Sequence, residues 1–233
     1  MQTEIGFDLI SDLYLSPDES FNWESKPTSL YCLVAGNVSS DMKTVLQTLT
    51  HLGRQYQGVF YVPGMLEYET ADDVWTRTEE LLEISENIPN VCPLHQNVVV
   101  IDGIAVIGAN GWCESGDTYT TGKMFHTASR REDFNYLNNT IEKLQLHLDI
   151  KKIVVLSNAV PHPDLYFGEK PEITDDQIPL CVTLAGDTER KVTHWIFGSY
   201  GKNVDTYFGN INFMNNQYLH QKPYWPRRIT ISI

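Results

Sequence analysis

The sequence predicts an α/β fold in which two packed, mixed sheets are flanked by helices. Short apolar runs typical of buried strands alternate with segments whose apolar residues recur at helical spacing. In the middle of the chain, the apolar stretch 97–109 is interrupted by Asp102-Gly103, which favours a tight hairpin because both turn positions need positive φ. The alternation indicates parallel strands joined by helices, and the hairpin adds antiparallel pairing.

The apolar runs place the strands. We expect strands over 7–15, 30–35, 58–63, 153–156 and 192–197, and then a β-rich tail with Gly209, Asn210 and Asn215 in its turns. Two stretches rich in Gly, Pro, Thr and Asp are expected to be surface loops: 111–125 and 162–177.

Three segments have the spacing of amphipathic helices. The first is expected after a cap by one of three consecutive polar residues: Ser39, Ser40 or Asp41. The second is expected over 72–86. The third is expected to begin near Ser129, which has capping-box spacing with Glu132, and to continue to Leu148.

Length, composition and charge limit the classes of protein to which this chain can belong. A chain of 233 residues with 42% hydrophobic residues indicates one domain spanning 1–233. No apolar run is long enough to cross a membrane, and the N-terminus lacks the features of a signal peptide, so we expect a cytoplasmic protein. Four widely spaced cysteines predict reduced thiols. The net charge of −13 argues against nucleic acid and anionic membranes as partners.

Five strand-to-loop junctions carry the groups on which function is expected to depend, because ligand and catalytic groups of α/β folds gather at the carboxyl ends of strands. They are S-D-L-Y (11–14), G-N-V (36–38), P-G-M-L-E (63–67), S-N-A-V-P (157–161) and F-G-S-Y-G (197–201). No P-loop, G-x-S-x-G elbow or G-x-G-x-x-G motif offers a different chemistry.

In order and separation, these junctions resemble the blocks of the calcineurin-like metallophosphoesterases, which are D-x-H, G-D, G-N-H-E, T-H-H-x-P and G-H-x-H. The surrounding frames match as well: ISDLYL, LVAGNV, YVPGMLEYE, VVLSNAVPHP and HWIFGSYGKNVD. The resemblance spans residues 5–215. It implies the family's four-layer α/β/β/α sandwich.

The residues that differ from the family pattern decide the expected function. In the family, two divalent metals about 3.5–4 Å apart are bridged by an Asp and activate a water. On the resemblance, Asp12 keeps the first ligand position, whereas the neutral Asn37 stands where the bridging carboxylate would be. The other substituted positions, of which Leu66 replaces the general acid, are Tyr14, Met65, Leu66, Asn158, Ala159, Ser199 and Gly201. Because close dications need anionic ligands to offset their repulsion, we expect no metal, no other cofactor and no catalytic residue.

We therefore expect a pseudo-phosphoesterase that is not an enzyme and that acts as a protein-binding scaffold or regulatory module. Its protein partner is not specified by the sequence. Two alternatives stay open. One is a module that binds a nucleotide or other small molecule in the remnant cleft. The other is a residual phosphoesterase with an atypical metal site. Apart from this, Asp12, Asn37 and Asn158 offer oxygen ligands for one weak cation.

The segment 222–228 groups two aromatic residues with three basic ones. One interpretation is an interaction anchor, because aromatic residues and Arg dominate binding hot spots. Its members would be Tyr224, Trp225, Arg227 and Arg228. The other interpretation, which we favour, is a connector that packs its aromatics on the core before a last edge strand over 229–233.

Overall fold

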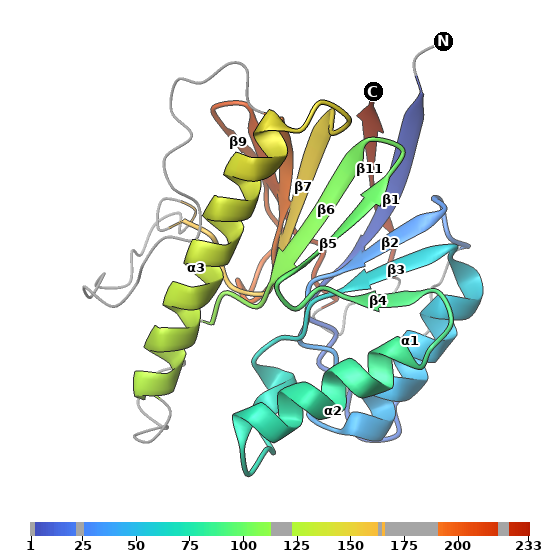
Figure 1. Ribbon diagram of the computed structural model, residues 1–233. Helices are drawn as coiled ribbons and strands as arrows, with labels where there is room; N and C mark the ends of the chain where they lie inside the picture. Colours follow the sequence, from blue (N-terminus) through green and yellow to red (C-terminus); the bar gives the residue numbers. More distant parts are fainter. Residues whose placement is uncertain (1–2, 22–25, 113–122, 163–164, 166–190, 219–223) are drawn as a thin grey trace.

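A computed structural model of the chain describes residues 3–21, 26–112, 123–162, 165, 191–218 and 224–233. The architecture is mixed α/β, with a five-stranded and a six-stranded sheet packed against each other. One long helix lies outside the larger sheet, and two helices lie outside the smaller one (Figure 1). The predicted four-layer α/β/β/α fold class is therefore confirmed.

The smaller sheet has the strand order β11-β1-β2-β3-β4. Its strands are β1 (Glu4–Ile10), β2 (Tyr31–Val34), β3 (Gly58–Tyr61), β4 (Val91–Pro93) and β11 (Arg227–Ser232). The first four are parallel, and β11 pairs antiparallel with β1 at the edge. Helices α1 (Met42–Gln55) and α2 (Val74–Glu86) make the crossovers from β2 to β3 and from β3 to β4. They therefore cover the same face and run in the same direction (Figure 1).

The larger sheet has the strand order β5-β6-β7-β8-β10-β9. Its strands are β5 (Asn97–Ile101), β6 (Ile104–Ala109), β7 (Lys152–Ser157), β8 (Val192–Ile196), β9 (Asp205–Phe208) and β10 (Ile211–Met214). Strands β6, β7, β8 and β10 are parallel, while the β5-β6 and β9-β10 pairs are antiparallel. Helix α3 (Lys123–Leu146) covers the outer face, against which Leu137 and Ile141 are buried (Figure 1).

The core between the sheets is made of apolar side chains from both of them. Phe7 and Leu33 of the smaller sheet belong to the same buried cluster as Val106 and Leu156 of the larger one. All four are fully buried. Removing this much apolar surface from water fixes the two sheets, and hence their carboxyl ends, relative to each other.

The local signals explain where the first two helices begin. The Asp41 carboxylate accepts a hydrogen bond from the Thr44 N–H at 2.8 Å, so Asp41 is the cap among the three candidates. Asp73 caps α2 in the same way, through the Thr76 N–H at 2.8 Å. The predicted hairpin is also confirmed, with φ of 45° at Asp102 and 85° at Gly103.

Several boundaries differ from the prediction. Strand β1 ends at Ile10 rather than at residue 15, because Asp12 and Tyr14 adopt positive φ and cannot continue a strand. The predicted start of α3 at Ser129 is wrong. The helix begins at Lys123, directly after Gly122, since no Gly or Pro stands between Lys123 and Ser129. Leu148 lies beyond the helix end and is 84% exposed. The three-residue strand β4 is too short to predict, and much of the two expected loops (113–122, 163–164 and 166–177) lies outside the described residues.

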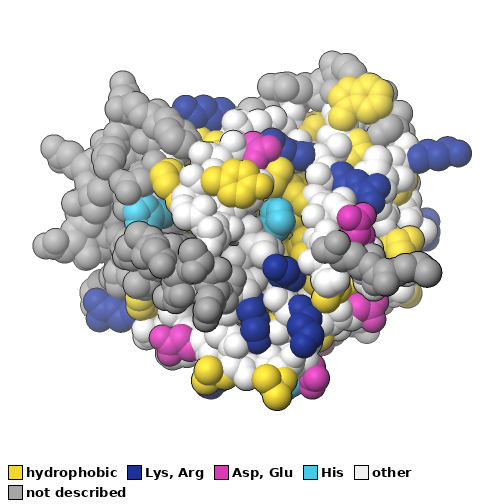
Figure 2. All heavy atoms as spheres, turned by 90° about the horizontal axis from the view of Figure 1, so that it is seen from above, with side chains coloured by type: hydrophobic (Ala, Val, Ile, Leu, Met, Phe, Trp, Pro, Cys, Tyr) yellow, Lys and Arg dark blue, Asp and Glu magenta, His cyan; other side chains and the backbone are white. Residues whose placement is uncertain are grey.

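The face at which β6 and β7 begin carries a group of Lys and Arg side chains (Figure 2). At this end, Lys151 Nζ donates to the Leu148 carbonyl at 2.7 Å and Lys191 Nζ donates to the His147 carbonyl at 2.7 Å. These carbonyls follow the C-terminus of α3, where a positive charge is stabilising. The two lysines therefore have a structural role at the helix end.

Two further observations concern the described part of the chain. None of its helices is both long enough and apolar enough to cross a lipid bilayer. Cys32 and Cys92 are free thiols, while Cys113 and Cys181 lie outside the described residues.

The hairpin generates a first prediction. Gly103→Ala is expected to lower the free energy of unfolding by about 1–2 kcal/mol, because an L-residue at φ 85° is strained. Asp102→Gly is the matched control. It is expected to stay within about 0.5 kcal/mol of the wild type, since glycine accepts positive φ. Urea unfolding measures both, and equal costs at the two positions would contradict the assignment of the turn.

Candidate functional site

The five sequence junctions meet where the parallel strands of the two sheets end. Hydrogen bonds cross between them: the Asn158 amide, after β7, donates to the Ala35 carbonyl after β2 at 2.8 Å. The Ser199 N–H, after β8, donates to the Asp12 carboxylate after β1 at 2.9 Å. The structure therefore brings together residues that are up to 187 positions apart in the chain.

Asp12 lies at the centre of this arrangement and is 1% exposed. Its Oδ1 accepts from Asn37 Nδ2 at 2.7 Å and from the Ser199 N–H. Its Oδ2 has no hydrogen-bond partner among the described residues, although Ser11 and Gln217 lie near enough to favour its charged form. Burial outweighs these contacts and raises the pKa of Asp12 above its ordinary value.

The orientation of the Asn37 amide is fixed by its two ends. Its Oδ1 accepts from the Leu66 N–H at 3.0 Å, so the oxygen points away from Asp12. Its Nδ2 faces Asp12 and also lies 2.9 Å from Ser199 Oγ and 3.3 Å from the Tyr14 hydroxyl. Turning the amide over would set an NH₂ group against the Leu66 N–H and an oxygen against a carboxylate. The group that faces Asp12 is therefore a donor.

Asn158 and Ser199 continue the same network. Ser199 Oγ donates to Asn158 Oδ1 at 2.9 Å, and the Met65 N–H approaches the same oxygen at 3.3 Å. Asn158 is fully buried, and its amide nitrogen donates a hydrogen bond to the Ala35 carbonyl. The polar atoms of these neutral side chains thus satisfy one another.

The Glu67 side chain connects two of the junctions, 36–38 and 63–67. Its buried carboxylate accepts from the N–H groups of Asn37 (3.1 Å), Val38 (2.8 Å) and Gly64 (3.0 Å), and from the Tyr61 hydroxyl (3.1 Å). Burial raises the pKa of Glu67 to about 6, against the opposing effect of these hydrogen bonds. These contacts give Glu67 a structural role.

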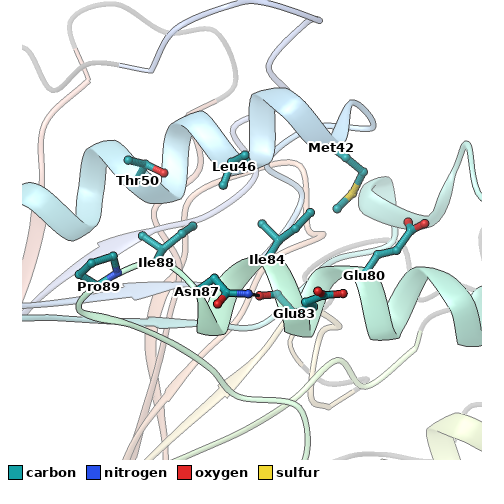
Figure 3. A pocket seen from close by; sticks show the side chains of 9 residues that line it. All are labelled: Met42, Leu46, Thr50, Glu80, Glu83, Ile84, Asn87, Ile88 and Pro89. Carbon is teal, nitrogen blue, oxygen red and sulfur yellow. Dashed lines mark hydrogen bonds between the residues drawn. The ribbon is translucent and has the colours of Figure 1, made fainter.

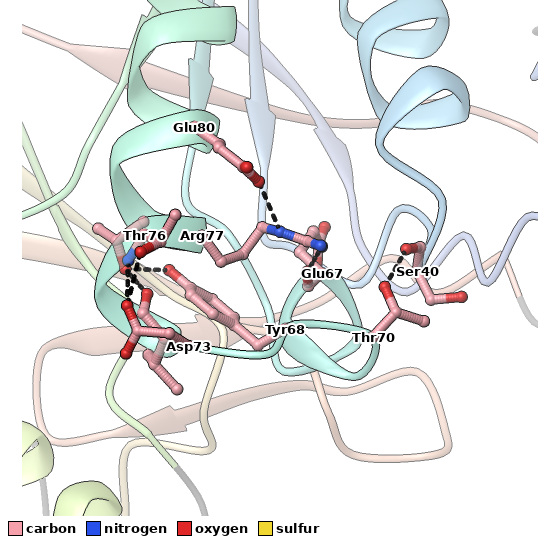
Figure 4. A network of polar contacts seen from close by, with 10 residues as sticks. Ser40, Glu67, Tyr68, Thr70, Asp73, Thr76, Arg77 and Glu80 are labelled. Atoms are coloured by element: carbon pink, nitrogen blue, oxygen red, sulfur yellow. Dashed lines mark hydrogen bonds and ion pairs between the residues drawn. The ribbon is translucent and has the colours of Figure 1, made fainter.

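The loop after β3 is also fastened to α2 (Figure 4). Arg77 donates to the Glu67 carbonyl at 2.7 Å and pairs with Glu80 at 3.0 Å. Thr70 donates to the Ser40 carbonyl at 3.0 Å, which connects this loop to the one before α1. The loop that carries Glu67 is therefore held by α2 and by the loop before α1.

The backbones of the second and third junctions pack closely against each other. A Cβ atom on Gly64 would lie 2.4 Å from the Asn37 nitrogen, so only glycine fits there. Asp12, Tyr14, Asn37 and Ser199 all have φ between 47° and 56°. Non-glycine residues rarely adopt such values and are held there by the surrounding contacts.

The remaining predicted positions lie at the margin of the network. Ala159 is buried, and its N–H donates to the Asn110 carbonyl at 2.9 Å. Gly201 is exposed, and the Tyr14 side chain is 40% exposed. Asn110 was missed by sequence reasoning. It also donates to the Pro63 carbonyl at 2.8 Å, and its signal was the N-G-W segment (110–112) directly after β6.

The C-terminal group is mostly engaged within the chain. Tyr224 is buried, and its hydroxyl donates to the Asn216 carbonyl. Arg227 donates to two backbone carbonyls and pairs with Asp205 at 2.6 Å, and Arg228 donates to the Thr28 carbonyl at 3.1 Å. The Trp225 side chain, in contrast, is 59% exposed.

These residues do not fit a pair of divalent metals. The bridging position offers an amide NH₂ instead of a carboxylate oxygen, and Asn158 turns its own NH₂ toward a carbonyl. In the described ranges, no three His, Cys, Asp or Glu side chains come together in a way that could hold a metal ion. With Asp12 as the one carboxylate of the network, the repulsion between two close dications would not be offset.

Comparisons with known proteins place the fold. No protein-family model and no curated protein sequence matches the chain. Among solved structures, it is similar to phosphopantetheinyl hydrolase from Mycobacterium tuberculosis, with a TM-score of 0.63, 16% identity and coverage of 97% of this chain and 96% of that one. It is also similar to a putative 5'-nucleotidase from Staphylococcus aureus, with a TM-score of 0.56, 14% identity and 92% coverage, and spans 49% of that structure's length.

The architecture is therefore phosphoesterase-like, as the five junctions predict. These neighbours correct the prediction that the chain is not an enzyme, because the fold it shares is that of a hydrolase and of a putative nucleotidase. At these identities the similarity concerns the fold. It leaves the chemistry of the site to be argued from the residues themselves.

The inward-facing donor at position 37 generates a second prediction. Asn37→Asp is expected to lower the free energy of unfolding by about 3 kcal/mol at pH 7, because it sets a second buried carboxylate against Asp12. The loss should shrink on acidification, as one of the two carboxyl groups takes up a proton. Asn139→Asp, the same change at an exposed position of α3, is the control and should cost less than about 0.5 kcal/mol. Chemical unfolding at several pH values measures both, and a pH-independent loss would contradict the contact.

The raised pKa of Glu67 generates a third prediction. Because the folded state holds this proton more tightly than the unfolded state, its contribution to stability is fully present below pH 4.5 and is lost as the pH rises through about 6. The free energy of unfolding of the wild type, relative to Glu67→Gln, should fall by about 2 kcal/mol between pH 4 and pH 7. A difference that stays constant or rises over this range would show that Glu67 is not held in this way.

Proposed function

We propose that the chain is a binding protein built on a phosphoesterase fold and that its partner is a protein. The observation that carries this proposal is the network around Asp12, in which neutral side chains use their polar atoms on one another. Such a network holds the surrounding loops rigid. On this proposal, the substitutions at Tyr14, Asn37 and Ser199 mark a degenerate member of the metallophosphoesterase family.

The chemistry of the site argues against a phosphate ligand. The side chains of Asp12, Asn37, Asn158 and Ser199 bond to no Lys or Arg within the described residues, and phosphate recognition depends on such groups. Lys202, three positions after Ser199 in the chain, has its Nζ over the Tyr200 ring, 5.3 Å from its centroid. A small-molecule role in the remnant cleft has less support, because Asp12, Asn37 and Asn158 are buried.

Metal-dependent phosphoester hydrolysis is the second candidate. It is favoured by the fold shared with a hydrolase and a putative nucleotidase, and by the buried Asp12 carboxylate at the end of β1. This candidate needs a metal set other than the family's bridged pair, with Asp12 as its anionic ligand. Turnover that requires both a metal ion and Asp12 would be its signature.

One experiment separates the two candidates. The tagged chain is used to capture a partner, the complex is reconstituted from purified components, and its stoichiometry is measured by native mass spectrometry with EDTA present. A defined complex is the expected result. In parallel, a generic phosphodiester is incubated with the chain and Mn²⁺. The absence of a reconstituted complex, together with turnover that Asp12→Asn abolishes, would replace binding by hydrolysis.

A further inference from the structure

A groove of about 820 Å³ lies between α1 and α2, away from the residues of the network. Its lining comes from the two helices and the turn that follows α2: Met42, Leu46, Thr50, Glu80, Glu83, Ile84, Asn87, Ile88 and Pro89. The side chains of Met42, Leu46 and Ile84 point into the space between the helices (Figure 3). The two helices run in the same direction there, as the crossovers require.

The floor of the groove is apolar. Ile88 belongs to the core cluster, and Met42 and Ile84 pack against that cluster with part of their surface left exposed, whereas Leu46 is not part of it. Helix α1 buries Val45, Leu49 and Leu52 against the sheet. Met42, Leu46 and Thr50 follow each other at every fourth residue along its outer side, over about 12 Å of helix. Leu46 is 39% exposed, although it points at a neighbouring helix. On the other side, α2 and the turn after it line the groove from Glu80 to Pro89, so the length along α1 matches about two turns of a third helix.

The charge at the rim has one sign. Glu80 and Glu83 border the groove from α2, and its lining contains no Lys or Arg. Glu80 pairs with Arg77, whereas Glu83 has no ion pair within the described part of the chain. On the other side of Leu46, a smaller hollow of about 470 Å³ is lined by His51 and Arg54. A helix with an apolar stripe and basic flanking residues would therefore place those basic residues next to Glu80 and Glu83 rather than next to Arg54.

We propose that this groove binds a short amphipathic helix of a protein partner, with apolar side chains on Met42, Leu46 and Ile84 and a Lys or Arg near Glu83. The inference rests on the proposed binding function and names its surface. Helices recognised in this way insert apolar anchors at i, i+3 or i+4, and i+7. A second copy of this chain is a poorer occupant, because each copy carries a net charge of −13.

The test uses a synthetic helical peptide of about fourteen residues with leucines at i, i+4 and i+7 and lysines beside them. The control is the same peptide with every lysine replaced by glutamate. We expect the lysine peptide to bind, to shift the amide resonances of residues 42–50 and 80–88, and to bind more weakly as salt is raised. Leu46→Asp should weaken binding by about tenfold, and Glu83→Lys by about threefold. Leu148→Asp is the matched control. It makes the same substitution at an exposed leucine beyond the end of α3 and should leave binding unchanged.

The outcomes are distinct. Equal binding of the glutamate peptide, resonance shifts elsewhere, or no binding by either peptide would overturn the groove as this kind of site. A dimer of the chain that Leu46→Asp dissociates would assign the groove to a second copy and overturn it as well. The exposed position of Leu46 keeps the variant folded, which its thermal unfolding checks. If the reconstituted partner complex survives Leu46→Asp, the groove fails while the proposed binding function stands. If no partner complex forms, the binding function itself fails.

Discussion

The hydrogen bond from the Asn37 amide to Asp12 Oδ1, 2.7 Å long, decides what the centre of this molecule can hold. A carboxylate at position 37 would draw cations toward Asp12, whereas the amide places a hydrogen-bond donor there. The Leu66 N–H prevents the amide from turning over, because it needs the Asn37 oxygen. Ser199 and Asn158 extend the same bonding pattern across the ends of both sheets.

The fold supplies the conditions for this network and depends on it in turn. Packing of the two sheets brings the ends of β1, β2, β3, β7 and β8 together, which places five loops in contact. Loops so close need their buried polar groups satisfied, and the side chains of Asn37, Asn158 and Glu67 accept or donate the hydrogen bonds that do this. The positive φ values and the close approach at Gly64 are tolerated because these contacts hold the backbone in place.

The architecture was predictable because its signals are periodic and local. Alternating strands and helices, the Asp102-Gly103 turn and the carboxylate cap at Asp41 all act over a few residues. The family frames then indicated which loops would meet. The start of α3 was missed because capping-box spacing at Ser129 also occurs inside a helix that nothing interrupts. The direction of the Asn37 amide, the role of Asn110 and the groove between α1 and α2 depend on contacts between distant segments, which no local pattern encodes. The step from altered ligands to "not an enzyme" went beyond the sequence, because the fold is one that enzymes use.

Whether Asp12 and Asn37 can hold a pair of metal ions is measured in a crystal of the protein soaked in Mn²⁺, with data collected at the manganese absorption edge. We expect no pair of anomalous peaks between Asp12 and Asn37, with the Asn37 Nδ2 atom remaining in contact with Asp12 Oδ1. Two peaks about 3.5–4 Å apart, bridged by residue 37, would contradict it.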